Sequence, residues 1–220
     1  MKKLVTLLLS MAFVGGISAQ TCVGNCFNGN GTYAWKSGDK YEGTFKNGKP
    51  NGQGTLQTAA GDTYTGEFKD GKFDGKGVYT WKNGSTYDGE FKAGLKSGFG
   101  VYTYANGDKY EGNFENNKFN GEGTFTWKSG ANYVGNFKDG LRDGNGKMTY
   151  NIGGIYEGEW VAGMRQGQGK QITGNSNEQI GQFASDKFMT GTFVYKDGTG
   201  QVEYIDGKPT SIPQANNKKK

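Results

Sequence analysis

The sequence predicts an all-β protein, built as one elongated, twisted antiparallel sheet that meanders through tandem β-hairpins of 23 residues each. Segments of the form Tyr-x-Gly-x-Phe recur every 23 residues, and each is followed by a Gly-x-Gly pair at a constant distance. Leu, Ile, Val and Phe make up only 37 of the 220 residues, which is too few for an ordinary globular core. The 31 aromatic residues and 41 glycines are regularly spaced, however, and this indicates a repeated backbone geometry instead of a disordered chain.

Residues 1–19 are predicted to be a cleaved secretory leader. Lys2 and Lys3 precede an apolar run that begins at Leu4, and small residues precede a cleavage point after Ala19. The apolar run is too short to span a bilayer, so a membrane anchor is the weaker interpretation. We therefore expect an exported protein, located in the periplasm, on the outer surface or outside the cell.

Residues 20–26 are expected to form an N-terminal cap that contains both cysteines of the chain, Cys22 and Cys26. An oxidising compartment would allow a disulfide between them, which would pin the start of the array and do little else. A metal site is the weaker alternative, because the sequence contains no histidine and no other metal-binding side chains lie nearby.

Residues 27–200 are expected to form the repeat array. Six segments keep the 23-residue spacing strictly: Tyr41–Phe45, Tyr64–Phe68, Tyr87–Phe91, Tyr110–Phe114, Tyr133–Phe137 and Tyr156–Trp160. A weaker seventh copy follows at Gln179–Phe183, and the first Gly-x-Gly pair, at Gly29 and Gly31, indicates half a unit at the start. Gln179 and Asp186 depart from the repeat pattern, as expected of a capping unit at the end of an array.

Each unit is predicted to hold two short strands, because polar and apolar residues alternate with a period of two. The connection after the second strand contains strong hairpin dipeptides such as Asn83-Gly84, whereas Asp70–Asp74 is expected to be a longer glycine-containing loop. The array should contain about fifteen strands and measure roughly 70 Å in length.

Two turn lengths are possible at the Asn-Gly dipeptides. A two-residue turn would pair Thr80 with Tyr87 and would place aromatic residues on both faces of the sheet. A three-residue turn, Lys82–Gly84, would pair Tyr79 with Tyr87 and Gly75 with Phe91. We prefer the three-residue turn, because it places every aromatic residue on one face and gives each Phe ring a glycine to lie over. After the array, residues 201–208 are expected to form a terminal strand and residues 209–220 a disordered basic tail.

The pattern Tyr-x-Gly-x-(Phe/Trp)-x-x-Gly-x-x-x-Gly-x-Gly closely resembles the MORN (membrane occupation and recognition nexus) repeat. The resemblance covers residues 27–200. It implies a sheet of tandem hairpins and a role in protein interaction, dimerisation or phospholipid binding, with the repeats often placed beside a catalytic domain. A fold shared by many proteins does not by itself assign a function to this one.

Charge and composition exclude several functions. The formal net charge is +5, but Lys2, Lys3 and Lys218–Lys220 account for all of it, so the body of the chain is neutral. This argues against nucleic-acid binding and gives no support to an anionic membrane surface as the ligand. The chain contains no histidine, no nucleophile motif and no phosphate-binding loop. We therefore expect no enzymatic activity, no cofactor and no metal.

Two surfaces are candidates for binding. The first is a ridge of apolar residues at the expected long loops, which would bind a protein partner or form a homodimer unless these residues pack on neighbouring loops: Phe73, Leu95, Phe119, Leu141, Met164 and Phe188. The second is an aromatic face, which would bind a glycan of the cell wall unless its rings form the core: Tyr41, Tyr64, Tyr87, Tyr110, Tyr133, Tyr156, Trp81 and Trp127. A phospholipid ligand is the weakest of the three possibilities, and protein interaction is the leading one.

Overall fold

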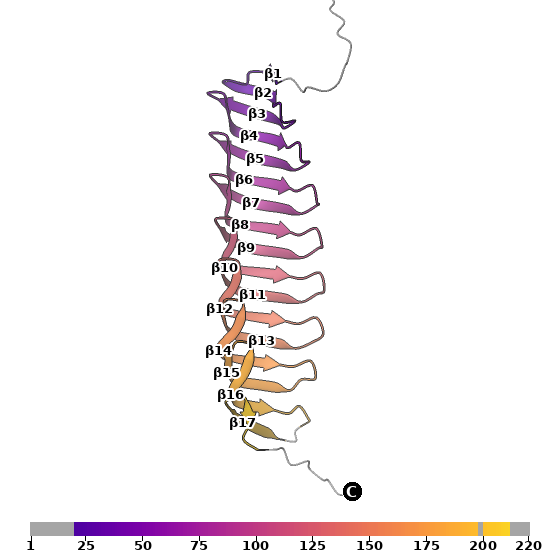
Figure 1. Cartoon of the computed structure of the whole chain (residues 1–220), viewed down its shortest axis with the longest axis vertical. Coiled ribbons are helices and arrows are strands. Elements are labelled where there is room, and N and C mark those ends of the chain that lie inside the picture. Colours follow the sequence, from indigo (N-terminus) through magenta and orange to yellow (C-terminus); the bar gives the residue numbers. More distant parts are fainter. Residues whose placement is uncertain (1–19, 198–199, 212–220) are drawn as a thin grey trace, which may run out of the picture.

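The computed structural model describes residues 20–197 and 200–211, which form one open antiparallel sheet (Figure 1). Within these residues there are 18 strands and no helix, and every strand pairs with its neighbours in the sequence. The predicted fold class is confirmed. The leader predicted at residues 1–19 and the part of the predicted tail at 212–220 lie outside the described residues.

The strands follow one another along the ribbon. Their bounds are β1 Thr21–Gly24, β2 Gly29–Ala34, β3 Lys40–Lys46, β4 Lys49–Gln57, β5 Thr63–Lys69, β6 Lys72–Thr80, β7 Thr86–Lys92, β8 Leu95–Thr103, β9 Lys109–Glu115, β10 Lys118–Thr126, β11 Asn132–Lys138, β12 Leu141–Thr149, β13 Ile155–Val161, β14 Met164–Ile172, β15 Glu178–Ala184, β16 Lys187–Val194, β17 Gln201–Ile205 and β18 Lys208–Pro209. The expected terminal strand is thus the hairpin β17–β18. Pro209 belongs to β18 and pairs with Tyr204, so the hairpin extends one residue into the segment predicted as tail.

The loop after each even-numbered strand from β2 to β14 closes as the three-residue turn predicted from the sequence. In the β6–β7 hairpin, Tyr79 pairs with Tyr87 and Gly75 pairs with Phe91. The Trp81 amide donates a hydrogen bond to the Ser85 carbonyl at 3.0 Å, and Gly84 takes a positive φ of 87°. Side chains alternate between the two faces of a strand. Because Tyr79 pairs directly with Tyr87, the tyrosines of both strands lie on the same face of the sheet.

The connection after each odd-numbered strand from β3 to β17 is a tight turn, and the long loop expected at Asp70–Asp74 is absent. Lys69 pairs with Lys72, which leaves only Asp70 and Gly71 in the turn, both with positive φ. The amide of Gly71 then donates a hydrogen bond of 2.8 Å to the carbonyl of Pro50 in the preceding unit. The same bond recurs from Gly94 to Phe73 and from Gly140 to Phe119, so it locks neighbouring units together along this edge.

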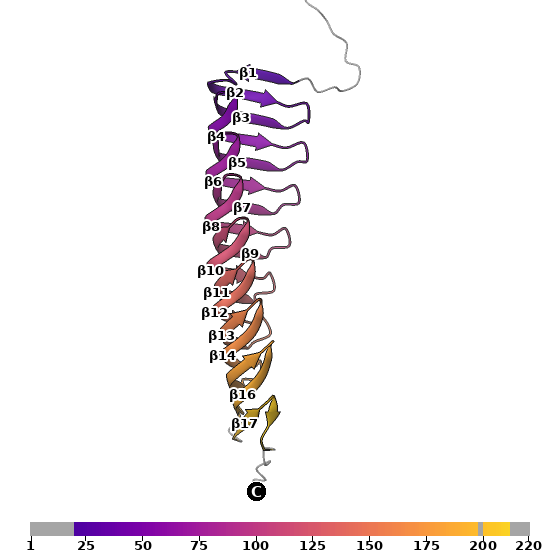
Figure 2. The same cartoon turned by 60° about the vertical axis from the view of Figure 1, so that its left-hand side comes forward.

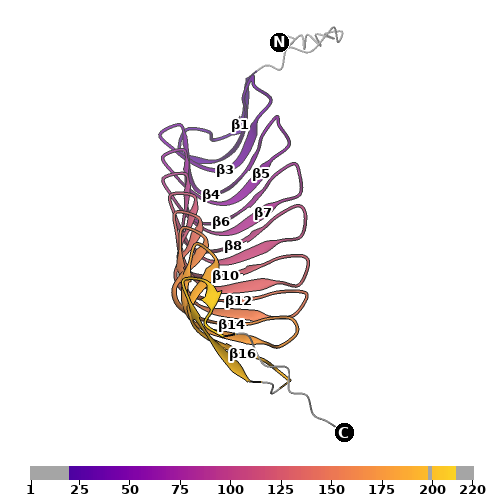
Figure 3. The ribbon, with the colours of Figure 1, turned by 60° about the horizontal axis from the view of Figure 1, so that its bottom comes forward.

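The first glycine of each Gly-x-Gly pair bends its strand. Between β5 and β6 the pairing jumps from Gly66↔Gly77 to Phe68↔Phe73, which leaves extra residues on β6 around Gly75. Gly75 has a φ of 102°, as expected of a glycine in a β-bulge. Figures 2 and 3 show the resulting curvature of the strands, which gives the ribbon a hollow side and an outward side.

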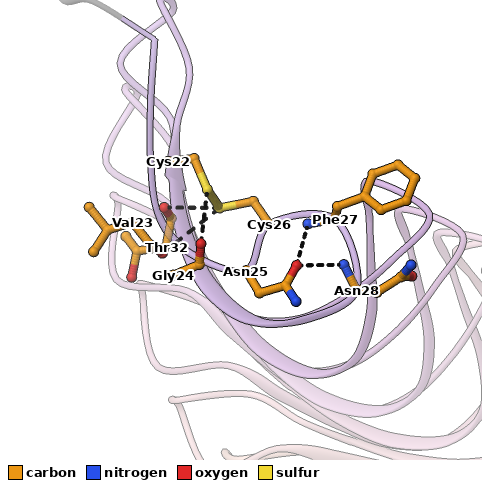
Figure 4. The surroundings of a disulfide bond; sticks show 8 residues. All are labelled: Cys22, Val23, Gly24, Asn25, Cys26, Phe27, Asn28 and Thr32. Atoms are coloured by element: carbon orange, nitrogen blue, oxygen red, sulfur yellow. Dashed lines mark hydrogen bonds between the residues drawn. A yellow bond between two sulfur atoms is a disulfide. The ribbon is translucent and has the colours of Figure 1, made fainter.

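The N-terminal end is capped by the disulfide between Cys22 and Cys26, which links β1 to the turn that follows it (Figure 4). The Asn25 side chain stabilises this turn by accepting hydrogen bonds from the amides of Phe27 and Asn28, at 3.2 and 2.8 Å. A Cβ atom built on Gly31 would lie 3.0 Å from the Cys26 sulfur. The disulfide therefore covers the exposed end of the core.

A candidate binding groove on the aromatic face

The repeated tyrosines of the predicted aromatic face form the core of the sheet. Tyr41, Tyr64, Tyr87, Tyr110, Tyr133 and Tyr156 are each at most 1% exposed. Each ring lies on the second glycine of a Gly-x-Gly pair, and a Cβ atom built on Gly77 would approach the Tyr64 ring to 2.5 Å. The prediction that a Phe ring lies over the first glycine is wrong, because a Cβ atom on Gly75 would meet the Glu67 carboxylate instead.

The tyrosine hydroxyls are also satisfied inside the protein. Each donates a hydrogen bond to the carbonyl of the residue three positions later, for example from Tyr41 to Thr44 at 3.0 Å and from Tyr110 to Asn113 at 2.9 Å. Burial raises the pKa of Tyr41, Tyr133 and Tyr156 to about 12. These six rings are therefore structural, and a ligand has no access to them.

Half-buried aromatic residues border this core along the edge of the three-residue turns. Here Trp81 and Trp127, the two tryptophans of the predicted face, belong to a continuous stripe of rings. Successive centroids along the stripe are 4.5–6.0 Å apart, in the order Tyr79, Trp81, Tyr102, Tyr104, Phe125 and Trp127. We call these six residues the aromatic stripe.

The other border of the core is made by the second residue of each long even-numbered strand. We call this series the lid column, and it consists of Pro50, Phe73, Lys96, Phe119, Arg142 and Arg165, with Phe188 at the equivalent place in β16. The lids lie on the tyrosine rings: Phe73 stacks on Tyr64 with 3.8 Å between centroids, and Phe119 stacks on Tyr110 at 3.7 Å. The Arg142 guanidinium lies 4.0 Å from the centroid of Trp160.

The predicted apolar ridge does not exist as one row. Phe73, Phe119 and Phe188 belong to the lid column and pack against the core, and not on neighbouring loops as the alternative interpretation of the ridge expected. Leu95, Leu141 and Met164 occupy the position one residue earlier and are 40%, 50% and 42% exposed. All six residues lie in strands, and not in the loops expected from the sequence. The two sets differ because the lids occupy the second position of their strands, whereas the other three residues occupy the first position, beside the tight turn.

Two hollows with an apolar floor lie between the lid column and the turns of the opposite edge, and we call the strip that holds them the groove. The first hollow, of about 480 Å³, is lined by Trp35, Ser37, Asp39, Tyr41, Pro50, Leu56, Phe68, Gly71, Lys72, Phe73 and Gly94. A second hollow, of about 210 Å³, lies farther along and includes Phe119, Trp127, Leu141 and Arg142. Since residues from both edges line the first hollow, the aromatic face is the hollow side of the ribbon.

Two cations of the lid column are partly buried within this groove. Lys96 lies among four aromatic rings, and burial lowers the pKa of its ammonium group. Burial likewise lowers the pKa of Arg142. At the rim, Asp39 accepts hydrogen bonds from the Ala59 amide and the Ser37 hydroxyl, both at 2.8 Å, and these bonds hold its pKa below the usual value. The groove therefore combines aromatic rings with both signs of charge.

The lid column was missed by the sequence analysis. Aligning the units at a spacing of 23 residues would have placed Phe73, Lys96, Phe119, Arg142 and Arg165 in one series. The series holds only phenylalanines and long cations, which is the composition expected of a position that covers an aromatic ring.

The outward side is mainly polar, with one aromatic exception. Phe99 occupies the middle position of a Gly-x-Gly triplet, points away from the tyrosines and is 53% exposed. The prediction that every aromatic residue shares one face is therefore wrong at Phe99. Shallow hollows flank this ring, with Glu111, Glu122 and Val134 on one side and Asp88, Glu90 and Val101 on the other.

The residues that the structure describes contain no group of three or more His, Cys, Asp or Glu side chains that could hold a metal ion. The same part of the chain contains no helix that is long and apolar enough to cross a membrane.

The model of the MORN repeat matches the chain in seven consecutive copies, at residues 27–40, 41–63, 64–86, 87–109, 110–131, 133–155 and 156–178. No curated protein matches the chain.

Two TCP domains are among the solved structures to which the chain is similar. The SAS-4 (dCPAP) TCP domain of Drosophila melanogaster, in complex with a proline-rich motif of Ana2 (dSTIL), is 10% identical with a TM-score of 0.46, and the match covers 80% of this chain and 99% of that chain. The wild-type TCP10 domain of Danio rerio CPAP is 11% identical with a TM-score of 0.40, and the match covers 83% of this chain and 79% of that chain. Similarity at this level carries no argument about function.

Proposed function

We propose that this chain, which belongs to the MORN repeat family, is a non-catalytic scaffold of the cell envelope or exterior that binds a protein partner along its groove. The observation that carries the proposal is the apolar floor of the groove between two charged or aromatic borders. Partner-binding surfaces commonly place aromatic and apolar residues at the centre and polar residues at the rim.

The second hollow supports the same surface. Leu141, from the predicted ridge, and Trp127, from the predicted aromatic face, both line it. The half-buried ring of Trp127 supplies a large, rigid contact area, and tryptophan is enriched among residues that dominate binding energy. The partner is either another protein or a second copy of the chain.

A capture experiment tests the groove directly. Mature protein would be immobilised and exposed to an envelope fraction of the native cell, and compared with the double variant Trp35→Ala/Trp127→Ala. The matched control is Thr55→Ala/Thr124→Ala, which changes the outward side of two equivalent strands. We expect one protein to be retained by the wild type and the control but lost by the groove variant. Light scattering of purified protein separates a homodimer from a different partner. Equal retention by all three forms would contradict the proposal.

Glycan binding is a second candidate, which the aromatic stripe favours. Its rings are half-buried rather than fully enclosed, so their outer parts are available for stacking on sugar rings. Replacing Tyr102 and Tyr104 with Ala should then abolish retention on isolated cell-wall glycan. Retention that is unchanged in this variant, or absent in the wild type, would exclude the stripe as a glycan site.

Two features support a location outside the cytoplasm. Residues 1–19 have the composition of a secretory leader, and the Cys22–Cys26 disulfide suits an oxidising compartment. Mass spectrometry of the mature protein should find an N-terminus near Gln20. Recovery of intact Met1 from the cytosol would show that the chain is not exported.

A further inference from the structure

Lys96 shows what the groove can hold. Its ammonium nitrogen lies 4.5 Å from the ring centroid of Tyr102, 5.3 Å from Trp81, 5.6 Å from Tyr87 and 5.8 Å from Phe114. Cations within about 6 Å of an aromatic centroid are attracted by the electron-rich face of the ring. The groove of this unit is thus a four-membered cage occupied by the protein's own lysine.

The hollow of about 480 Å³ is the same cage two units earlier. Subtracting 46 residues from each member of the Lys96 cage gives Trp35, Tyr41, Leu56 and Phe68, and all four line this hollow. Three of these four positions keep the same residue type, with Leu56 in place of Tyr102. The lid that corresponds to Lys96 is Pro50, which pairs with Phe45 as Lys96 pairs with Phe91. A proline is too short to fill the cage, and this explains the open volume of about 480 Å³.

The empty cage also has a carboxylate that the occupied one lacks. Asp39 lines the hollow, and the equivalent residue beside Lys96 is Ser85. Hydrogen bonds from the Ala59 amide and the Ser37 hydroxyl hold the Asp39 side chain in place. The only other charged residue of the lining is Lys72, whose side chain is exposed. The site therefore has the rings and the negative charge that a cation needs.

We propose that this hollow binds the side chain of a lysine residue from the partner protein, in the place that Lys96 fills two units later. The aliphatic stem would lie on Pro50 and Leu56, and the ammonium group would lie over the half-buried ring of Trp35 within reach of Asp39. The inference rests on the proposed function, because it takes the groove as the partner-binding surface. It adds the chemical group that the groove recognises.

The test uses the whole mature chain and a small probe, Nα-acetyl-lysine N-methylamide. Titration would be followed by the NMR signal of the Trp35 indole N–H, assigned by its loss in Trp35→Phe. We expect a saturable shift with the lysine probe and none with the neutral norleucine analogue. Asp39→Asn should weaken binding about fivefold, as expected of a partly exposed ion pair.

Pro50→Lys is the decisive variant. It places in the first cage the residue that fills the later one, so binding of the probe should be lost. Thr55→Lys is the matched control, because it adds the same charge to the outward side of the same strand and should keep binding within about twofold of the wild type. Circular dichroism would establish that both variants keep the fold.

Three results would overturn the inference: no saturable shift in the wild type, equal binding of the norleucine analogue, or equal loss in Pro50→Lys and Thr55→Lys. Tighter binding of the corresponding arginine derivative would overturn the assignment to lysine. The partner capture experiment separates the two proposals. Capture that survives Pro50→Lys but fails in Trp127→Ala would end the lysine inference and leave the groove as the binding surface.

Discussion

The two glycines of each Gly-x-Gly pair are required for different physical reasons. At Gly123 a Cβ atom would lie 2.5 Å from the Tyr110 hydroxyl oxygen, so the second glycine makes room for the ring. At Gly121 a Cβ atom would have ordinary contacts, with Asn113 at 3.7 Å, but the residue has a φ of 74°. The first glycine therefore serves the backbone of the bulge, since glycine adopts such a φ with the least strain.

Substitutions should separate these two roles. Gly123→Ala and Gly123→Asn should both lower the free energy of unfolding by about 1–3 kcal/mol, because any added side chain overpacks the Tyr110 ring. Gly121→Ala should cost about 1–2 kcal/mol through the left-handed backbone, and Gly121→Asn should recover part of that loss because asparagine tolerates this conformation. Urea unfolding of the four variants measures the difference. A Gly121→Asn variant no more stable than Gly121→Ala would contradict the backbone explanation.

The buried tyrosines predict how stability depends on pH. Burial raises the pKa of Tyr41, Tyr133 and Tyr156 from 10.0 to about 12. A pKa that is higher in the folded state means that the unfolded chain loses its protons first as the pH rises. The contribution of these protonated tyrosines to the stability of the fold is therefore complete below pH 10 and is lost between pH 10 and about 12. We expect unfolding and tyrosinate absorbance to rise together in this range. Tyrosinate formation near pH 10 with an intact fold would show that the rings are not enclosed.

At the scale of strands and turns, the repeat spacing was sufficient to predict the sheet but not its bend. The pairing of Tyr79 with Tyr87 followed from the requirement that the tyrosines share one face. The bulge was missed because Asp70–Asp74 was interpreted as a loop, although Asp70-Gly71 is itself a two-residue hairpin dipeptide. Once the strand includes Phe73, the register slips around Gly75 and Phe73 turns onto the core. The groove depends on this slip, so it could not be predicted from the spacing alone.

The disulfide cap should act only on the end of the sheet that it covers. Cys22 and Cys26 close a short loop beside β1 and β2, and the Cys26 sulfur lies on Gly31. Replacing both residues with Ser should leave the strand content measured by circular dichroism nearly unchanged. Amide hydrogen exchange should become faster in β1 and β2 while β7–β12 keep their protection. Loss of the whole strand signal would show that the cap is required for the entire array.

Over the whole molecule, each strand contacts its immediate neighbours, so stability is distributed along the ribbon. The hydrogen bonds between successive tight turns, such as Gly71 to Pro50 and Gly94 to Phe73, also join adjacent units only. In arrays of this kind the free energy of folding is close to a sum of unit terms and nearest-neighbour terms. The ends differ from the centre: a disulfide covers the first unit, and Gln179 replaces the buried tyrosine in the last.

Damage in the middle of such an array should remain local. Gly123→Val places a branched side chain under the Tyr110 ring, which also contacts Phe114, Phe119 and Phe137. These rings come from β9–β11, so the packing that is lost belongs to one unit and its next neighbour. Hydrogen exchange resolved by segment should show faster exchange in β9–β11 in this variant than in the wild type, with little change in β3–β5 and β15–β16.

Glu111→Val, on the outward side of β9, is the control and should change stability by about 0.5 kcal/mol or less. If Gly123→Val accelerates exchange equally in all strands, the ribbon unfolds as a single cooperative unit. A nearest-neighbour description would then fail, because the terminal hairpins share no side-chain contact with Gly123.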